Sequence, residues 1–207
     1  MVTGYPHRMV PAPAPGPVPP GPAPDREQAL VELVDPAGRA VGTATVAQAH
    51  TAPGRLHRAF SVLLLTPDHQ RLLLQQRSPA KTRFPLRWAN TCCGHPAPGE
   101  PVAAAATRRL AEEVGLAGVS LTEVGVWQYR AGDPDSGEVE YEYDHVLLGR
   151  LPAEQPLAPD PAEIAELRWV DPAELSDLLA SRPAACAPWL AGVVRPLAAA
   201  AGPRWIR

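Results

Sequence analysis

The amino-acid sequence predicts one α+β domain over residues 25–207, in which a mixed sheet is flanked by helices. Stretches typical of strands and of helices mingle along the chain without the regular alternation that predicts a purely parallel sheet. The 207 residues, 45% of them hydrophobic, are enough for one well-packed domain plus a tail. Residues 1–24 contain nine prolines among alanines and glycines. Such a segment lacks regular backbone donors and large apolar side chains, so we predict a disordered tail.

Two hairpins are expected in the first third of this domain. Apolar runs surround a Pro/Gly turn within residues 29–45, which is typical of two paired strands. The runs at residues 56–65 and 71–77 predict a second hairpin, with the polar segment 66–70 as its turn. The stretch NTCCGHPAPGE at residues 90–100 follows, and its cysteines, prolines and glycines make a poor strand and no helix.

The strongest helix signal covers residues 101–116. A proline opens it, its interior is rich in alanine, and Gly115 provides the stop. Alternation and short apolar runs then predict three strands, at residues 121–129, 138–149 and 165–170. Two C-terminal helices complete the prediction: residues 171–180, with Asp171 as N-cap, and residues 187–200, interrupted or ended near Pro196.

Composition excludes several classes of protein. No window approaches the roughly 18–20 apolar residues that cross a bilayer, and the net charge of −3 indicates neither a nucleic-acid nor a membrane partner. The three cysteines are odd in number and two adjoin, which argues against a disulfide framework and for a reducing compartment. We therefore expect a cytoplasmic monomer that acts on a small molecule.

The helix at residues 101–116 carries a possible phosphate site. Arg109 and Glu113 are four residues apart and therefore share a face, which Glu112 does not. A carboxylate there can hold a hard divalent cation, while the arginine contacts a phosphate through two hydrogen bonds. Taken alone, RRLAEEVG favours the alternative, an ordinary solvated helix surface that carries ion pairs.

Histidines and alternating glutamates indicate a second possible metal site. The residues concerned are His50, His57, His95, Glu138, Glu140 and Glu142. A strand would place the three glutamates on one side, where they repel one another unless they are solvated or neutralised by a cation. Three histidines with two of the glutamates suit a six-coordinate divalent ion, and nitrogen ligands favour Mn²⁺ or Zn²⁺ over Mg²⁺. A solvent-facing acidic stripe is the alternative.

From Gly94 onward the chain resembles the Nudix signature, G-x5-E-x7-R-E-U-x-E-E-x-G-U, where U is apolar. It matches at every fixed position except the glutamate after Arg108, which is Arg109 here. The resemblance implies the Nudix fold, an α/β/α sandwich in which helix carboxylates bind Mg²⁺ on a diphosphate. In hydrolytic members the missing glutamate belongs to the metal cluster that activates water. We therefore expect diphosphate binding without efficient hydrolysis.

A longer resemblance covers roughly residues 28–195. The segments AHT, RLHRAFS, QQRSPAKTRFPLRWANTCCGHP, RRLAEEVG, YEYD and PW occur in the order found in type I isopentenyl-diphosphate isomerases. That family interconverts isopentenyl and dimethylallyl diphosphate in isoprenoid biosynthesis, by protonation and deprotonation through a tertiary carbocation. The alternatives are a Nudix hydrolase that cleaves a nucleoside diphosphate derivative, and a non-catalytic module that binds metal or diphosphate.

The isomerase resemblance implies a role for each site residue. The catalytic pair is Cys93 and Glu142, and Tyr129, otherwise a core aromatic of its strand, hydrogen-bonds near the acid. The resemblance places a divalent ion (Mn²⁺, Zn²⁺ or Mg²⁺) on His50, His57, His95, Glu140 and Glu142. It places Mg²⁺ and the diphosphate on Glu113, the backbone carbonyl of Cys93, Arg77, Lys81 and Arg109. The Trp189 indole would face the carbocation, Cys92 would serve packing, and a further family lysine is replaced near Val46.

Overall fold

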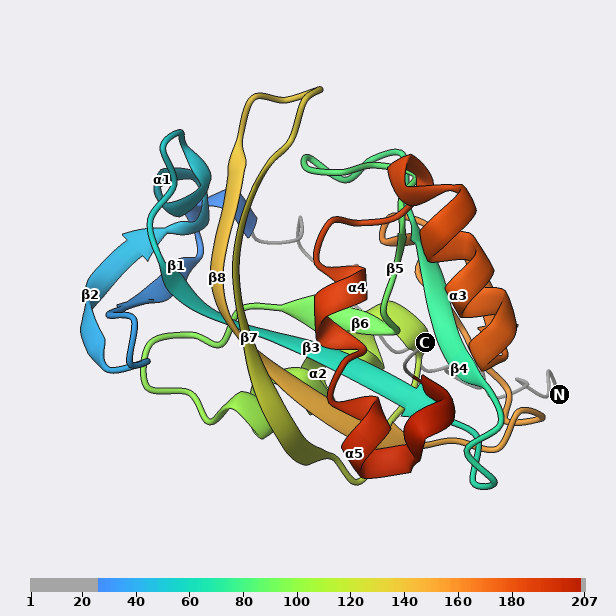
Figure 1. Cartoon of the computed structure of the whole chain (residues 1–207). Coiled ribbons are helices and arrows are strands. Elements are labelled where there is room, and N and C mark those ends of the chain that lie inside the picture. Colours follow the sequence, from blue (N-terminus) through green and yellow to red (C-terminus); the bar gives the residue numbers. More distant parts are fainter. Residues whose placement is uncertain (1–25, 206–207) are drawn as a thin grey trace, which may run out of the picture.

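The computed structural model describes residues 26–205, so the predicted tail at residues 1–24 lies outside the described part of the chain. Within that part, one nine-stranded sheet carries helices on both faces (Figure 1). The strands are β1 (Leu30–Val34), β2 (Ala40–Thr45), β3 (His57–Leu65), β4 (Leu72–Arg77), β5 (Trp88–Ala89), β6 (Cys92–Gly94), β7 (Thr122–Gly132), β8 (Val139–Arg150) and β9 (Ile164–Val170). The helices are α1 (Val46–His50), α2 (Val102–Val114), α3 (Pro172–Ser181), α4 (Leu190–Val193) and α5 (Leu197–Ala201), with short 3₁₀ turns η1 (Arg26–Gln28), η2 (Pro183–Ala185) and η3 (Pro203–Trp205).

Strand β3 organises the sheet because it pairs with β1, β4, β6 and β8. Of these four pairings, only the one with β8 is parallel. The sheet is therefore mixed, as predicted. In the view of Figure 1, the long β7–β8 hairpin rises between α1 and β5. Strand β9 pairs with β4.

The two faces of β3 bury two separate cores. Leu63 and Leu65 pack in one core with Leu190 of α4 and with residues of α3 and α5. Leu64 packs in the other core with Leu110 of α2. Alternate residues of a strand point to opposite faces, so helices cover both sides and the architecture is the α/β/α sandwich expected of a Nudix fold. In Figure 1, α2 lies behind β3, and α4 and α5 lie in front of it.

Most predicted elements are confirmed. Both hairpins form, and α2 ends at Val114, followed by Gly115 as its C-cap in the left-handed conformation (φ 73°) that favours glycine. Helix α3 begins after Asp171, whose side chain accepts the Glu174 N–H, and the C-terminal helical stretch is interrupted at Pro196. The longest described helix has 13 residues, and no helix in residues 26–205 is long and apolar enough to cross a membrane.

Two local predictions were wrong. The sequence predicts that residues 50–57 run from a loop into a strand, but His50 ends α1, a five-residue helix too short for periodicity and fixed by a capping box between Thr45 and Gln48. The stretch at residues 90–100 contains a strand, β6, because Cys93 pairs with Ser61 of β3. Its extended conformation comes from the neighbouring strand rather than from local propensity.

Candidate active site

Strand register brings the predicted metal ligands together. His57 is the first residue of β3 and lies opposite Glu142 in the parallel β3–β8 pair. Glu140 lies two residues before Glu142, on the same face of β8. Strand β6 runs antiparallel to β3, with Gly94 opposite Phe60, so the chain leaving β6 carries His95 back towards the start of β3. The site therefore forms where β3, β6 and β8 meet.

Helix α1 supplies the remaining ligand. His50 is its last residue, fully buried, and its Nε2 lies 2.9 Å from Glu140 Oε2. The Nδ1 atom of the same ring lies 2.7 Å from the carbonyl oxygen of Val46. This turn of helix thus fixes the orientation of the imidazole as well as its position.

The ligand atoms of the five predicted residues converge on one point. They lie within 4.8 Å of one another and belong to His50, His57, His95, Glu140 and Glu142. His95 Nε2 is 3.0 Å from Glu142 Oε1 and 3.2 Å from His57 Nε2. The two glutamates are 6% and 9% exposed, so these acids do not form a solvent-facing stripe. Glu138, the third acid, lies outside the cluster and accepts a 2.8 Å hydrogen bond from Arg83.

The chemistry of this donor set fits a divalent cation. His57 Nδ1 lies 2.8 Å from the carbonyl oxygen of Arg55, just as His50 Nδ1 faces that of Val46. A carbonyl only accepts, so both Nδ1 atoms carry a proton. In the neutral imidazoles both Nε2 atoms then present lone pairs to the cluster, whereas in the charged form of His50 its Nε2 donates to Glu140. Lone pairs directed at carboxylate oxygens repel unless a cation or a proton lies between them. Backbone acceptors that orient histidines in this way are typical of metal sites.

The two glutamates of the cluster have opposite pKa shifts. Burial and the negative charge of Glu140 raise the pKa of Glu142 to about 7. Burial also acts to raise the pKa of Glu140, but the hydrogen bond and charge of His50, together with the charge of Arg83, hold that pKa well below its usual range. The Tyr129 hydroxyl donates to Glu142 Oε2 over 2.7 Å. Neighbouring carboxyls in different protonation states are suited to acid–base work.

The thiol of Cys93 lies on the face of the sheet that also carries Trp189 and Tyr129. All three pack in the core beneath α4, and the Tyr129 and Trp189 ring centroids are 5.9 Å apart. Cys92 is fully buried in the opposite core, as the alternation of an extended segment predicts. Burial raises the pKa of Cys93 to about 12, against the opposing charges of Arg77 and Lys81, so the thiol holds its proton at neutral pH.

The predicted diphosphate contacts come from different elements. Arg109 of α2 pairs with Glu113, also of α2, and Lys81, in the turn after β4, has its Nζ 3.8 Å from Glu113 Oε1. The other carboxylate oxygen of Glu113 is buried, with no hydrogen-bond partner among the described residues. Glu113 is therefore suited to accept a cation.

Arg77 has a different environment from the other two cations. Its Nε and Nη2 donate to the backbone carbonyls of Phe84 and Arg83, at 3.1 and 2.8 Å. Its Nη1 lies 3.8 Å from Cys93 Sγ, and its Cζ is 5.4 Å from the centroid of the Trp189 ring. The guanidinium is thus fixed beside the thiol. Nη1 is its nitrogen that faces the thiol instead of donating to a backbone carbonyl.

Sequence reasoning did not identify two further charged residues of this region. Arg83 Nε lies 3.4 Å from Glu140 Oε1 and so steadies a predicted metal ligand. Glu163, directly before β9, is buried and pairs with Lys81. No local signal distinguishes Glu163 from Glu166, which is exposed three residues later.

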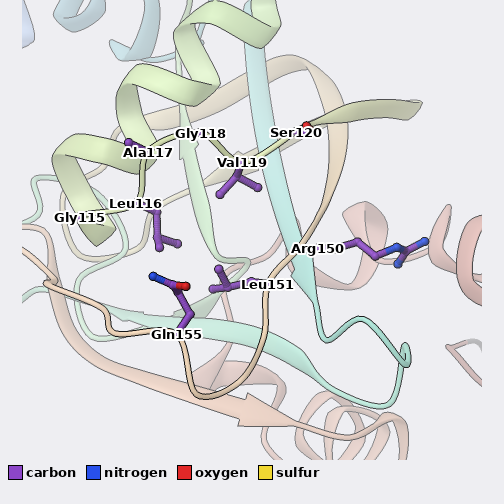
Figure 2. A pocket seen from close by; sticks show the side chains of 9 residues that line it. All are labelled: Gly115, Leu116, Ala117, Gly118, Val119, Ser120, Arg150, Leu151 and Gln155. Carbon is purple, nitrogen blue, oxygen red and sulfur yellow. The ribbon is translucent and has the colours of Figure 1, made fainter.

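The predicted site residues do not line either of two cavities elsewhere in the fold. One, of about 380 Å³, lies beyond the C-terminal end of α2 between Leu116, Val119, Leu151 and Gln155 (Figure 2). The other, of about 510 Å³, lies between α3 and the C-terminal helices and is lined by Leu175 and Trp205. Neither combines several titratable side chains in the way the His/Glu cluster does.

Known proteins resemble this chain in both sequence and fold. Residues 55–190 match the NUDIX domain family. An isopentenyl-diphosphate Delta-isomerase of Nocardia farcinica is 64% identical over 79% of this chain and 91% of its own length. One of Streptomyces coelicolor is 51% identical over 73% of this chain and 75% of its own length. The crystal structure of DR0079 from Deinococcus radiodurans aligns with a TM-score of 0.63 at 22% identity, over 80% of this chain and 98% of that one, which supports the fold alone.

Proposed function

The chain belongs to the Nudix domain family and, within it, to the isopentenyl-diphosphate Delta-isomerases, and we propose that Cys93 and Glu142 carry its acid–base chemistry. The protein interconverts isopentenyl and dimethylallyl diphosphate, a step of isoprenoid biosynthesis, rather than hydrolysing a nucleoside diphosphate derivative. We further propose that it acts as a cytoplasmic monomer without nucleic-acid or membrane partners.

One observation carries the assignment of the catalytic pair. The Glu142 carboxyl accepts from the Tyr129 hydroxyl, and the Tyr129 ring centroid is 5.9 Å from that of Trp189. The Cys93 thiol packs against the same core, and Arg77 links it to Trp189, with Nη1 3.8 Å from Cys93 Sγ and Cζ 5.4 Å from the Trp189 ring centroid. Moving the double bond requires a proton to be added at C4 and another to be removed from C2. Two acid–base groups on opposite sides of a flat five-carbon unit can exchange these tasks in the two directions of the reaction.

Protonation of the alkene creates positive charge at C3, which the chain must stabilise without a nucleophile. The Trp189 indole offers a π face, and a desolvated cation–π contact contributes about 2 kcal/mol. Its Nε1 donates to Asn90 Oδ1 over 3.0 Å, which fixes the plane of the ring. Trp189 is 3% exposed, so the surrounding core also limits access of water.

The metal and diphosphate contacts follow from the charges around this pair. We propose that His50, His57, His95, Glu140 and Glu142 hold Mn²⁺, Zn²⁺ or Mg²⁺, and that Glu113 and the Cys93 carbonyl hold Mg²⁺ with the diphosphate. A bound cation polarises the Glu142 carboxyl and makes it a stronger acid. Arg77, Lys81 and Arg109 then neutralise the diphosphate and orient the prenyl group towards Cys93.

A single assay tests the proposed function. The purified protein is incubated with isopentenyl diphosphate and Mg²⁺, and both dimethylallyl diphosphate and free phosphate are measured. We expect the allylic isomer without phosphate release. Phosphate without the isomer would instead identify a hydrolase, and neither product a binding module.

A further inference from the structure

Glu163 contacts two of the cations predicted for the diphosphate site, Lys81 and Arg109, although the sequence did not indicate it. Its carboxylate is buried, with the residue 4% exposed. Oε2 accepts a hydrogen bond from Lys81 Nζ, and Oε1 faces Arg109 Nη2 at 3.4 Å. Arg26 of η1, which is half-exposed, also pairs with Oε1. One carboxylate therefore serves cations from three separate segments of the chain.

Backbone hydrogen bonds fix the position of this carboxylate relative to the cations. The Glu163 carbonyl accepts the Ser78 N–H at 2.9 Å, which joins it to the turn that carries Lys81. The Glu163 N–H donates to the Asp160 carbonyl, and the Asp160 N–H donates to the Glu113 carbonyl, each over 2.9 Å. The second link joins the same segment to helix α2, which carries Arg109. The segment before β9 thus spans the two elements that supply the cations.

Charge balance explains why a carboxylate is needed there. The side chains of Lys81 and Arg109 are largely buried, 18% and 10% exposed. Two buried cations repel each other unless an anion lies between them. Glu113 contacts both, but it is the residue expected to bind the metal of the diphosphate complex. Glu112 accepts a 2.5 Å hydrogen bond from Arg109 Nη1 but has no contact with Lys81 among the described residues. Glu163 is then the remaining described anion that contacts both Lys81 and Arg109.

We propose that Glu163 is a positioning residue of the diphosphate site, which holds Lys81 and Arg109 directed at one point before the substrate arrives. The inference rests on the proposed function, because it assigns these two cations to the diphosphate. Without Glu163, the flexible four-carbon chain of Lys81 turns away from Arg109. Diphosphate binding then includes the free-energy cost of bringing Lys81 and Arg109 back together. Glu163 removes this cost in the wild type because it holds the two cations in place before binding.

The test uses Glu163→Gln, which keeps the shape of the side chain and removes its charge. Glu166→Gln is the matched control, since Glu166 is exposed in β9 and its replacement changes the net charge equally. The dissociation constant of inorganic diphosphate is measured by calorimetry with and without Mg²⁺, and KM and kcat are measured for isopentenyl diphosphate. A charged hydrogen bond of about 1.5–3 kcal/mol predicts weakening of about ten-fold or more, with KM raised more than kcat is lowered.

Glu163→Asp keeps the charge but shortens the side chain, so we expect about three-fold weaker binding, between wild type and Glu163→Gln. This variant decides the matter if Glu163→Gln does not fold, as judged by its melting temperature. Wild-type or tighter diphosphate binding in the folded variants would overturn the inference. So would a loss confined to buffer with Mg²⁺, because that would make Glu163 a metal ligand. If the wild type forms no dimethylallyl diphosphate, the proposed function fails instead.

Discussion

The hydrogen bond between Tyr129 and Glu142 offers a quantitative test of the acid–base assignment. The hydroxyl donates to Glu142 Oε2 over 2.7 Å and favours the ionised carboxylate. A hydrogen bond to a charged group contributes about 1.5–3 kcal/mol, and a pKa difference of one corresponds to about 1.4 kcal/mol. Removing the hydroxyl in Tyr129→Phe should therefore raise the pKa of Glu142 and shift the pH dependence by about one to two pH units.

The assay is the pH profile of kcat/KM for isopentenyl diphosphate with the metal-loaded enzyme. The limb that reports ionisation of Glu142 should move to higher pH in Tyr129→Phe, because the carboxyl keeps its proton longer. The ring of residue 129 keeps its packing against Trp189, with centroids 5.9 Å apart, so the melting temperature should change little. Tyr141→Phe is the control, since Tyr141 directly precedes Glu142 in β8 and points to the opposite face.

Two results would refute this reasoning. An unchanged profile in Tyr129→Phe at full activity would mean that Glu142 does not exchange the proton that limits the reaction. An equal shift in Tyr141→Phe would mean that the profile reports a general disturbance of β8 rather than the hydrogen bond.

Three further predictions concern catalysis, metal and fold. Cys93→Ala and Glu142→Gln should each lower turnover by about a thousand-fold or more, whereas Cys92→Ala, in the opposite core, should keep it; near-normal turnover in Cys93→Ala would contradict the assignment. Chelation should abolish turnover and lower the melting temperature, and adding back Mn²⁺, Zn²⁺ or Mg²⁺ separately identifies the effective ion; full activity after exhaustive chelation would exclude a metal role. Gly115→Ala places a Cβ 2.8 Å from Ala158 at φ 73° and should reduce the free energy of unfolding by more than about 1 kcal/mol in urea titrations. Gly118 has the same φ, but a Cβ there would meet no atom within 4 Å. An equal loss of stability in Gly118→Ala would therefore mean that backbone strain, and not contact with Ala158, causes the whole effect.

Much of the candidate site was predictable because strand periodicity constrains it. Glu140 and Glu142 are two apart, so they had to share a face once residues 138–149 formed a strand, and the structure confirms that strand. The opposite directions of Cys92 and Cys93 follow from the same rule. The convergence of His50 with these residues did not follow, because it depends on a short helix whose place is set by tertiary contacts with η1, β1, β2 and β8.

Glu163 and Arg83 show where sequence reasoning ends. Both become buried only because distant segments close around them: Arg83 pairs with Glu27 and Glu138, which are 56 and 55 residues away. An exposed glutamate and a buried, paired one have the same local sequence signals. Their roles therefore required the tertiary arrangement, and no periodicity could have supplied it.

Arg109, which stands where the Nudix signature has a glutamate, bears on the roles of both the predicted diphosphate site and the His/Glu cluster. In hydrolytic relatives, as the Nudix resemblance implies, this position supplies a carboxylate to a metal cluster that activates water. Here its guanidinium pairs with Glu113 and lies 3.4 Å from Glu163, so the position contributes a cation instead. A cation at this point favours retention of an intact diphosphate over generation of a hydroxide beside it. Acid strength must then come from elsewhere, and we propose that it comes from a cation held by the His/Glu cluster at the start of β3, of which the Glu142 carboxyl is a member.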